Sequence, residues 1–184
     1  MILFHSIQLL LKRPFPIHNI YEIDTTDSKL FLNREFNIEW QLVFDPDSIS
    51  SDVNYFVTGN YKIPNTWHRN DEEFYSGNFS AKLSGDNNFA FDFQIDPIQQ
   101  GQEYQVTVWE KGDQDKAIIV AGSIATGEFW AGSEEVVAES TGGWKKLRLR
   151  FTVPGNLSQG LKVYIWNNSR NSVYLDDFTI TRLK

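Results

Sequence analysis

The chain has 184 residues, of which 24 are acidic and 17 basic, so its formal net charge is −7. Binding to nucleic acid depends on clustered positive charge, and this composition therefore argues against a nucleic-acid partner. The sequence contains no cysteine, which excludes disulfides, thiolate metal sites and a cysteine nucleophile. A chain of this length suits one domain, or one domain with an extension.

Residues 1–35 differ in pattern from the rest of the chain. An apolar stretch at residues 2–11 is followed by Lys12-Arg13 and by two prolines. The stretch is shorter than the roughly 20 residues that a membrane helix needs, and it lacks the flanks of a signal peptide. Two interpretations stay open: the end of a membrane segment whose upstream part is missing, or a short element packed on the domain. We expect this region to be an extension or linker.

From about residue 36 onwards, apolar and polar residues alternate in short runs that are separated by turn residues. This period of two predicts β-strands, and no convincing amphipathic helix is present. The expected strands are 38–44, 89–95, 104–110, 117–121, 147–153, 161–166 and 173–181. Many short strands without crossover helices predict an all-β domain over residues 36–184, a β-sandwich of jelly-roll type.

Three of these strands carry aliphatic residues on one face and polar or aromatic residues on the other, because successive side chains alternate. Aromatic rings beside hydrogen-bond donors are typical of sugar recognition. The sequence therefore predicts an aromatic platform opposite the core. Its members are Trp109, Tyr164, Trp166, Gln105, Arg148 and Arg150. The alternative is that the two tryptophans cover the sandwich edge, or pack under a loop or under the N-terminal extension.

The same residues give little support for catalysis. The three histidines, His5, His18 and His68, are not at zinc-ligand spacing, and no Gly-x-Ser-x-Gly motif is present. The adjacent pairs Glu134-Glu135 and Asp176-Asp177 should point to opposite faces of a strand, whereas glycosidase carboxylates share a face. We therefore expect no enzymatic activity, with a lyase or hydrolase of sandwich fold as an alternative.

Four segments resemble, in order and spacing, the carbohydrate-binding modules that have the galactose-binding-like jelly roll. They are residues 75–83 (YSGNFSAKL), 100–111 (QGQEYQVTVWEK), 143–154 (GWKKL with FTVP) and 173–180 (VYLDDFTI). The resemblance covers about residues 36–184. It implies a non-catalytic module that binds a polysaccharide such as xylan or β-glucan, and it assigns Trp144 to the core.

The resemblance also implies a structural calcium ion. In the family, the Asp-Asp pair of the last strand commonly supplies a carboxylate ligand, which would be Asp177 here, and Asn78 would add a backbone carbonyl. Calcium prefers such oxygen ligands. The acidic partner segment of the family is missing from this chain, so Asp45 or Asp47 is expected to take its place. The alternative is that Asp176 and Asp177 only end a strand and cap a turn.

These observations lead to one functional prediction and one alternative. The prediction is a monomeric polysaccharide-binding module in the extracellular space, the periplasm or at the cell surface, within a larger polypeptide if one exists. Its ligand is expected to be neutral or mildly acidic, since the two arginines favour uronates. The alternative is an extracytoplasmic structural or interaction domain of a larger membrane or surface protein, such as a glycosyltransferase, without sugar affinity of its own.

Overall fold

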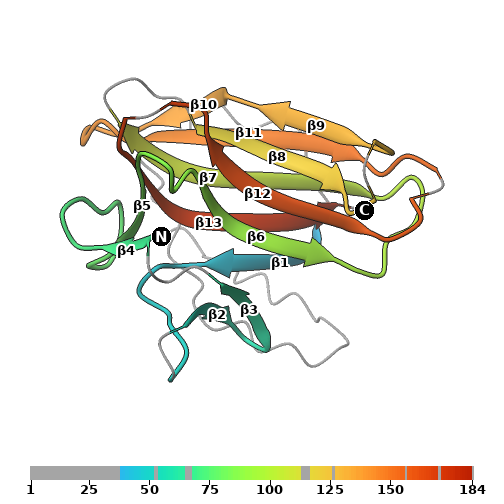
Figure 1. Ribbon diagram of the computed structural model, residues 1–184, viewed down its shortest axis with the longest axis horizontal. Coiled ribbons are helices and arrows are strands. Elements are labelled where there is room, and N and C mark those ends of the chain that lie inside the picture. The colour runs from blue at the N-terminus through green and yellow to red at the C-terminus, as the bar shows by residue number, and fades with distance from the viewer. Residues whose placement is uncertain are drawn as a thin grey trace, which may run out of the picture. The chain divides into compact units, whose positions relative to one another are not determined.

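Strands make up nearly all the regular structure in the computed structural model (Figure 1). The chain divides into two units, Met1–Asn33 and Arg34–Lys184. The structure describes residues 38–51, 54–64, 68–112, 117–125, 127–155, 157–169 and 171–183. The predicted extension at residues 1–35 lies outside these residues. Within them, no helix is long and apolar enough to cross a membrane.

The strands follow one another along the chain with short connections. They are β1 (Ile38–Phe44), β2 (Tyr55–Thr58), β3 (Tyr61–Pro64), β4 (Arg69–Asn70), β5 (Ser80–Leu83), β6 (Phe89–Ile95), β7 (Glu103–Gly112), β8 (Ala117–Ser123), β9 (Trp130–Ser133), β10 (Glu135–Glu139), β11 (Lys145–Thr152), β12 (Leu161–Asn167) and β13 (Val173–Leu183).

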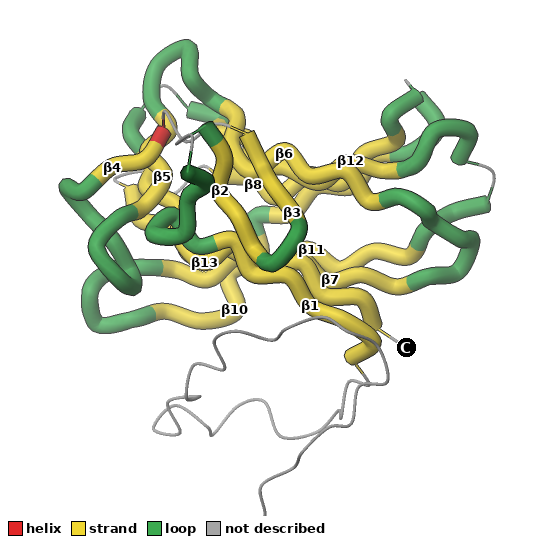
Figure 2. Tube along the Cα trace, turned by 90° about the horizontal axis from the view of Figure 1, so that it is seen from below, coloured by secondary structure: helices red, strands yellow, loops and turns green. Residues whose placement is uncertain are grey.

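Two antiparallel sheets form the layers of a sandwich, seen edge-on in Figure 2. The seven-stranded sheet has the order β10-β11-β7-β13-β5-β4, and β1 also pairs with β13. The four-stranded sheet has the order β6-β12-β8-β9. A separate hairpin, β2–β3, contributes the fully buried Phe56 and Ile63 to the core. The predicted all-β jelly-roll class is confirmed.

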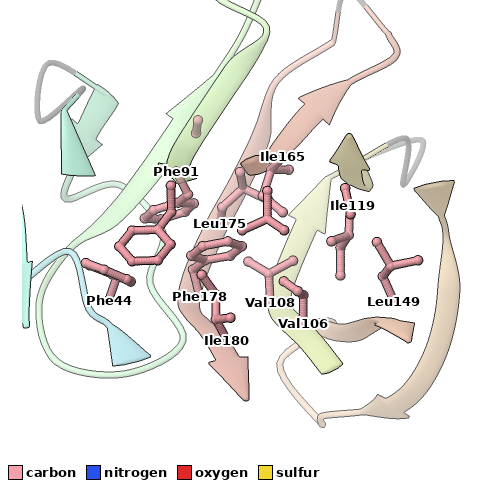
Figure 3. Close-up of a cluster of buried hydrophobic side chains, with 14 of the residues drawn as sticks. Phe44, Phe91, Val106, Val108, Ile119, Leu149, Ile165, Leu175, Phe178 and Ile180 are labelled. Carbon is pink, nitrogen blue, oxygen red and sulfur yellow. The ribbon is translucent and has the colours of Figure 1, made fainter. Parts of the chain in front are cut away.

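The core lies between the inner faces of the two sheets (Figure 3). Val106 and Val108 of β7 face Ile119 of β8 and Ile165 of β12 within one buried cluster. The alternation of apolar residues in the sequence predicted these inward positions, because burying one face of each strand removes its apolar side chains from water. Trp144 is 4% exposed, so its assignment to the core is also confirmed.

The alternation did not predict every strand. Each of the seven expected runs is a strand, and β1 has the expected bounds. The strands β2, β3, β4, β5, β9 and β10 were not predicted, because they are short and most show no clean alternation. Strands of this kind owe their conformation to the partner with which they pair rather than to their own pattern.

The register shifts in four of the ladders of the described residues, and at two of these places a non-glycine residue has a positive φ. Phe91 in β6 has a φ of 56°, and Asp177 in β13 has a φ of 48°. In the ladder between β6 and β12, the register shifts between Val163 and Ile165 of β12. In the ladder between β13 and β7, it shifts between Asp176 and Thr179 of β13. Bulges insert one residue and so change which side chains face outwards. The only other positive φ values among the described residues belong to glycines.

Packing of aromatic rings between the sheets supports both bulges. Phe91 stacks on Phe178 with ring centroids 5.0 Å apart and planes 7° from parallel, and both side chains are fully buried. We predict that Phe91→Ala lowers the free energy of unfolding by about 3–5 kcal/mol, because it leaves a cavity between the sheets. Urea denaturation measures this change. Phe74→Ala, at a ring that is 43% exposed, is the matched control and should have a much smaller effect. Equal losses in the two variants would contradict the prediction.

Candidate functional site

The outer face of the four-stranded sheet carries several aromatic side chains that are open to solvent. Phe89 on β6 is 50% exposed and Trp130 on β9 is 64% exposed. Tyr164 and Trp166 of β12 are half-buried between them. We call these four residues the aromatic face. An exposed group of aromatic rings on a folded domain marks a surface that binds a partner or ligand.

The bulge in β6 places Phe89 on this face. Ala90 pairs with Ile165 and Phe93 with Val163, and all four residues belong to the core. Because Phe91 is also in the core, two consecutive side chains face inwards and Phe89 is left facing outwards beside Trp166. The sequence placed Phe89 in one alternating series with Phe91 and Phe93. That prediction is wrong at Phe89, since a strict period of two does not allow for the extra residue of a bulge.

The rings of the aromatic face contact one another. Phe89 stacks on Trp166 at a centroid distance of 6.4 Å and an interplanar angle of 14°, and it meets Tyr164 edge-on at 5.7 Å. Lys162 Nζ lies 5.2 Å from the centre of the Tyr164 ring and 4.0 Å from Asp92 Oδ2. Burial, followed by the negative charge of Asp92, raises the pKa of Tyr164. Its hydroxyl therefore stays protonated and is available as a hydrogen-bond donor.

A hollow of about 580 Å³ opens on the same face of the sheet. It is lined by Gly122, Ser123, Ile124, Gly127, Glu128, Phe129, Trp130, Lys162 and Tyr164. Glu128 is held at the rim, because its two carboxylate oxygens accept hydrogen bonds from Ser158 N (3.0 Å) and Ser158 Oγ (2.6 Å). These bonds lower the pKa of Glu128. The hollow thus combines flat rings with a fixed carboxylate and an ammonium group, and these groups can accept and donate hydrogen bonds to hydroxyls.

The structure does not bring the six residues of the predicted platform together. Tyr164 and Trp166 belong to the aromatic face. The other four lie on β7 and β11, on the outer side of the seven-stranded sheet: Trp109, Gln105, Arg148 and Arg150. The period of two correctly showed that all six face away from the core. The period of two carries no information on which sheet a strand joins. The prediction that these six residues form a single platform is therefore wrong.

Trp109 is a packing residue in this structure. It is 8% exposed, and Tyr75 stacks on it at 4.0 Å with the planes 18° apart. Lys146 Nζ lies 5.4 Å from the centre of its ring. The alternative interpretation, that a loop covers this tryptophan, holds for Trp109.

The two arginines of the predicted platform form ion pairs with their neighbours. Arg148 binds Glu135 through two hydrogen bonds, Nε to Oε2 at 3.1 Å and Nη2 to Oε1 at 2.7 Å. Arg150 Nη2 lies 3.9 Å from Glu103 Oε2. Gln105 shares the outer side of this sheet and pairs in register with Arg150 and Thr181. These charges therefore balance one another on the seven-stranded sheet, and none of these residues lines the hollow.

Two residues missing from the prediction, Phe89 and Trp130, are the most exposed of the aromatic face. Phe89 was missed because the alternation placed it on the same face as Phe91 and Phe93. Trp130 lies in β9, which has no alternating pattern. The signal that could have found Trp130 is its sequence, Trp-Ala-Gly, because small neighbours cannot cover a large ring.

A second cluster of functional groups gathers at the bulge in β13. Asp45, Asp176 and Asp177 each place a carboxylate oxygen within 4.8 Å of the other two. Leu175 and Phe178 both face the core, so the bulge turns the two aspartates between them out of it. The expectation that Asp176 and Asp177 point to opposite faces is therefore wrong. Asp45 lies close to Asp177, and the role of these two residues as calcium ligands stays a prediction.

Asp176 ties this cluster to the loop before β5. Its Oδ2 accepts hydrogen bonds from the backbone N–H groups of Tyr75 (2.9 Å) and Ser76 (3.0 Å), and its Oδ1 accepts one from Asp177 N (2.8 Å). Ser76 Oγ donates to Asp177 Oδ1 at 3.2 Å. Asp47 holds the next part of the loop, since its Oδ2 accepts from Asn78 N at 3.0 Å. The role of Asn78 as an oxygen ligand stays a prediction.

The electrostatics of the cluster favour a bound cation. Burial, with a smaller contribution from the charge of Asp177, raises the pKa of Asp176 to about 7 despite its backbone donors. Burial also raises the pKa of Asp177, and the nearby Asp45 adds to that effect. Carboxylates crowded in this way repel one another, and a divalent cation would relieve the repulsion. The donor set, three carboxylates with no nitrogen or sulfur ligand among them, fits calcium.

Comparison with known proteins identifies the chain. A family model described as "Carbohydrate binding domain" (CBM_4_9) matches residues 48–171. A search of curated proteins returned no match.

Solved structures share the fold at low sequence identity. The CBM22-1 xylan-binding domain of Paenibacillus barcinonensis Xyn10C is 13% identical, with a TM-score of 0.50 over 83% of this chain and 98% of that one. The C-terminal family 22 carbohydrate-binding module of Clostridium thermocellum Xyn10B is 10% identical, with a TM-score of 0.50 over 82% and 97%. The likeness supports the jelly-roll fold. The family match covers more than half of the chain, which therefore belongs to the carbohydrate-binding domain family.

Proposed function

We propose that this carbohydrate-binding domain holds a polysaccharide chain on the aromatic face and in the adjoining hollow. The observation that supports this most directly is Trp130, an indole that is 64% exposed at the edge of a hollow lined by Lys162, Glu128 and Tyr164. The apolar C–H face of a sugar ring stacks on such a ring, while its hydroxyls bond to the polar groups.

The distribution of rings suits a chain rather than a single sugar. Trp130 lies on β9 and Phe89 on β6, at opposite edges of the four-stranded sheet. With strands about 4.8 Å apart, three strand spacings separate them by roughly 14 Å across the sheet. The two rings are also offset by four residues of β8, from Ile118 to Gly122, which adds roughly 13 Å along the strands. Rings separated diagonally in this way would contact several units of one polysaccharide.

The charges around the hollow favour a neutral polysaccharide. Asp92 and Glu128 carry negative charge there, and Lys162 lies within 4.0 Å of Asp92. The arginines that favoured uronates lie on the other sheet, where each has an acidic partner. The Paenibacillus barcinonensis domain named above is described as xylan-binding, so xylan is the first ligand to test.

We propose that the domain binds without catalysis. The support is that its family is one of binding domains, and that the rim carboxylate Glu128 is engaged by Ser158. Incubation with xylan should release no reducing ends. The alternative of a structural or interaction domain without sugar affinity predicts no binding to any polysaccharide.

The proposed binding site predicts different effects for two tryptophans, Trp109 and Trp166, which the alternation in the sequence places alike on outward faces. Trp166→Ala should weaken xylan binding by about fivefold to tenfold, since one stacked ring contributes on the order of 1 kcal/mol, and the domain should stay folded. Trp109→Ala should instead lower the free energy of unfolding by about 3 kcal/mol, because it removes a buried ring. Affinity electrophoresis in soluble xylan and thermal melting measure the two effects. Loss of binding in a folded Trp109→Ala domain, with Trp166→Ala unaffected, would place the site on the other sheet.

We also propose that Asp45, Asp176 and Asp177 bind one calcium ion with a structural role. These residues join the segment after β1, the loop before β5 and the last strand. An ion held there would reduce the repulsion between buried carboxylates and stabilise the loop that carries Tyr75. Calcium sites of extracellular modules are of this weak, carboxylate-rich kind. With a polysaccharide ligand, this supports a location outside the cytoplasm.

The calcium proposal predicts a shift in thermal stability. Calcium at about 100 times its Kd should stabilise the domain by about 2.7 kcal/mol relative to chelator, since the ion binds only the folded state. In Asp177→Asn, the melting temperature in calcium should equal the melting temperature in chelator. Asp86→Asn, in the exposed turn before β6, is the matched control and should keep it. Identical melting curves with calcium and chelator in the wild-type domain would refute the site.

A further inference from the structure

The indole of Trp130 lies close to Gly132, two residues further along β9. On the outer face, Trp130 pairs with Gly122 of β8, and Gly132 pairs with Val120. A Cβ atom built on Gly132 would lie 2.6 Å from Cη2 and 2.8 Å from Cζ2 of the Trp130 indole. Real Cβ atoms are not found so close to a neighbour. The six-membered ring therefore occupies the space that any side chain at position 132 would need.

The indole thus lies against the backbone of its own strand with its other side open. Val120 is fully buried although it is not part of the core between the sheets, and Tyr164 and Gly132 are its neighbours in register. The Trp130 ring over Gly132 therefore lies beside Val120 on the same face of the sheet. An indole in this position presents a flat surface to a sugar, whereas a tilted indole presents its edge.

Gly122 has a different role at the same place. The nearest atom to a Cβ built there is Phe129 O, at 3.7 Å, so a methyl group would fit without displacing a neighbour. Gly122 also pairs with Lys162, so the missing side chain leaves open the part of the hollow between Trp130 and Lys162.

We propose that Gly132 is a positioning residue that lays Trp130 flat as a sugar-stacking surface, and that Gly122 keeps the adjoining hollow open for the stacked sugar. This inference rests on the proposed function of the aromatic face. Neither glycine has a positive φ. Alanine at either position therefore strains no backbone, and its effect on binding comes from space alone.

The test uses the full chain and xylohexaose as a soluble probe, with affinity measured by titration calorimetry. Gly132→Ala should bind about fivefold to tenfold more weakly, the loss expected for one ring stack. Its melting temperature should fall only slightly, because the exposed indole can move aside and the remaining close contact of the added Cβ is Ile118 Cγ2 at 3.3 Å. Gly122→Ala should weaken binding while leaving Trp130 in place. Gly142→Ala, in the exposed turn between β10 and β11, is the matched control and should bind like the wild type.

Two further measurements separate positioning from a general structural effect. In protein labelled with 5-fluorotryptophan, the ¹⁹F resonance of Trp130, assigned with Trp130→Phe, should move in Gly132→Ala and stay in Gly122→Ala. In a Trp130→Ala background, adding Gly132→Ala should cost no further affinity, because the ring that the glycine positions is gone. If Gly132→Ala alone fails to fold, the double variant Trp130→Ala/Gly132→Ala still tests whether the clash is with the Trp130 ring, since removing that ring should restore folding.

Three outcomes would overturn the inference. The first is that Gly132→Ala binds xylohexaose with wild-type affinity. The second is that the ¹⁹F resonance of Trp130 does not move in Gly132→Ala. The third is that Gly132→Ala lowers the affinity by the same factor in the wild type and in the Trp130→Ala background. If the wild-type domain binds neither xylohexaose nor soluble xylan, the proposed function fails and the inference fails with it. If the wild type binds and only the glycine variants behave like controls, the proposed function stands and the role of the glycines is wrong.

Discussion

Phe91 of β6 and Phe178 of β13 stack across the interior of the sandwich at 5.0 Å, one ring from each sheet. Each ring lies at a β-bulge, since Phe91 itself has a φ of 56° and Phe178 follows Asp177, whose φ is 48°. Left-handed backbone at non-glycine residues costs of order 1–3 kcal/mol and persists only where packing imposes it. The stacked pair supplies such packing, because neither ring can leave the core without opening a cavity between the sheets.

The two bulges connect this contact to both candidate sites. In β6, the extra residue lets Ala90 and Phe91 both face inwards and leaves Phe89 outside against Trp166. In β13, the extra residue lies between Leu175 and Phe178 and turns two consecutive aspartates out of the core, within reach of Asp45. One inter-sheet contact therefore supports the aromatic face on one side of the domain and the carboxylate cluster on the other.

The two outer faces of the sandwich differ in how far their side chains cover one another. On the seven-stranded sheet, the long charged side chains pair with one another, as Arg148 does with Glu135, and Tyr75 covers Trp109. That face is closed by its own residues. On the four-stranded sheet, the exposed indole of Trp130 lies over Gly132, and Gly122 leaves space beside that indole. Missing side chains, as much as the aromatic rings, make this face open to a ligand.

The sequence by itself determined the all-β class, the seven strands with clear alternation, most of their inward residues and the family, because burial on one face imposes a period of two and the four motifs follow that pattern. It also identified Tyr164, Trp166, Asp45 and Asp177 as residues of candidate sites. Only the tertiary structure decided that Trp109 and Trp166 lie on different sheets, that Phe89 faces outwards, and that Asp176 joins Asp177 on one side. The physical reason is that sheet membership and bulges arise from pairing between strands distant in the chain, and alternation within one strand does not encode its partner.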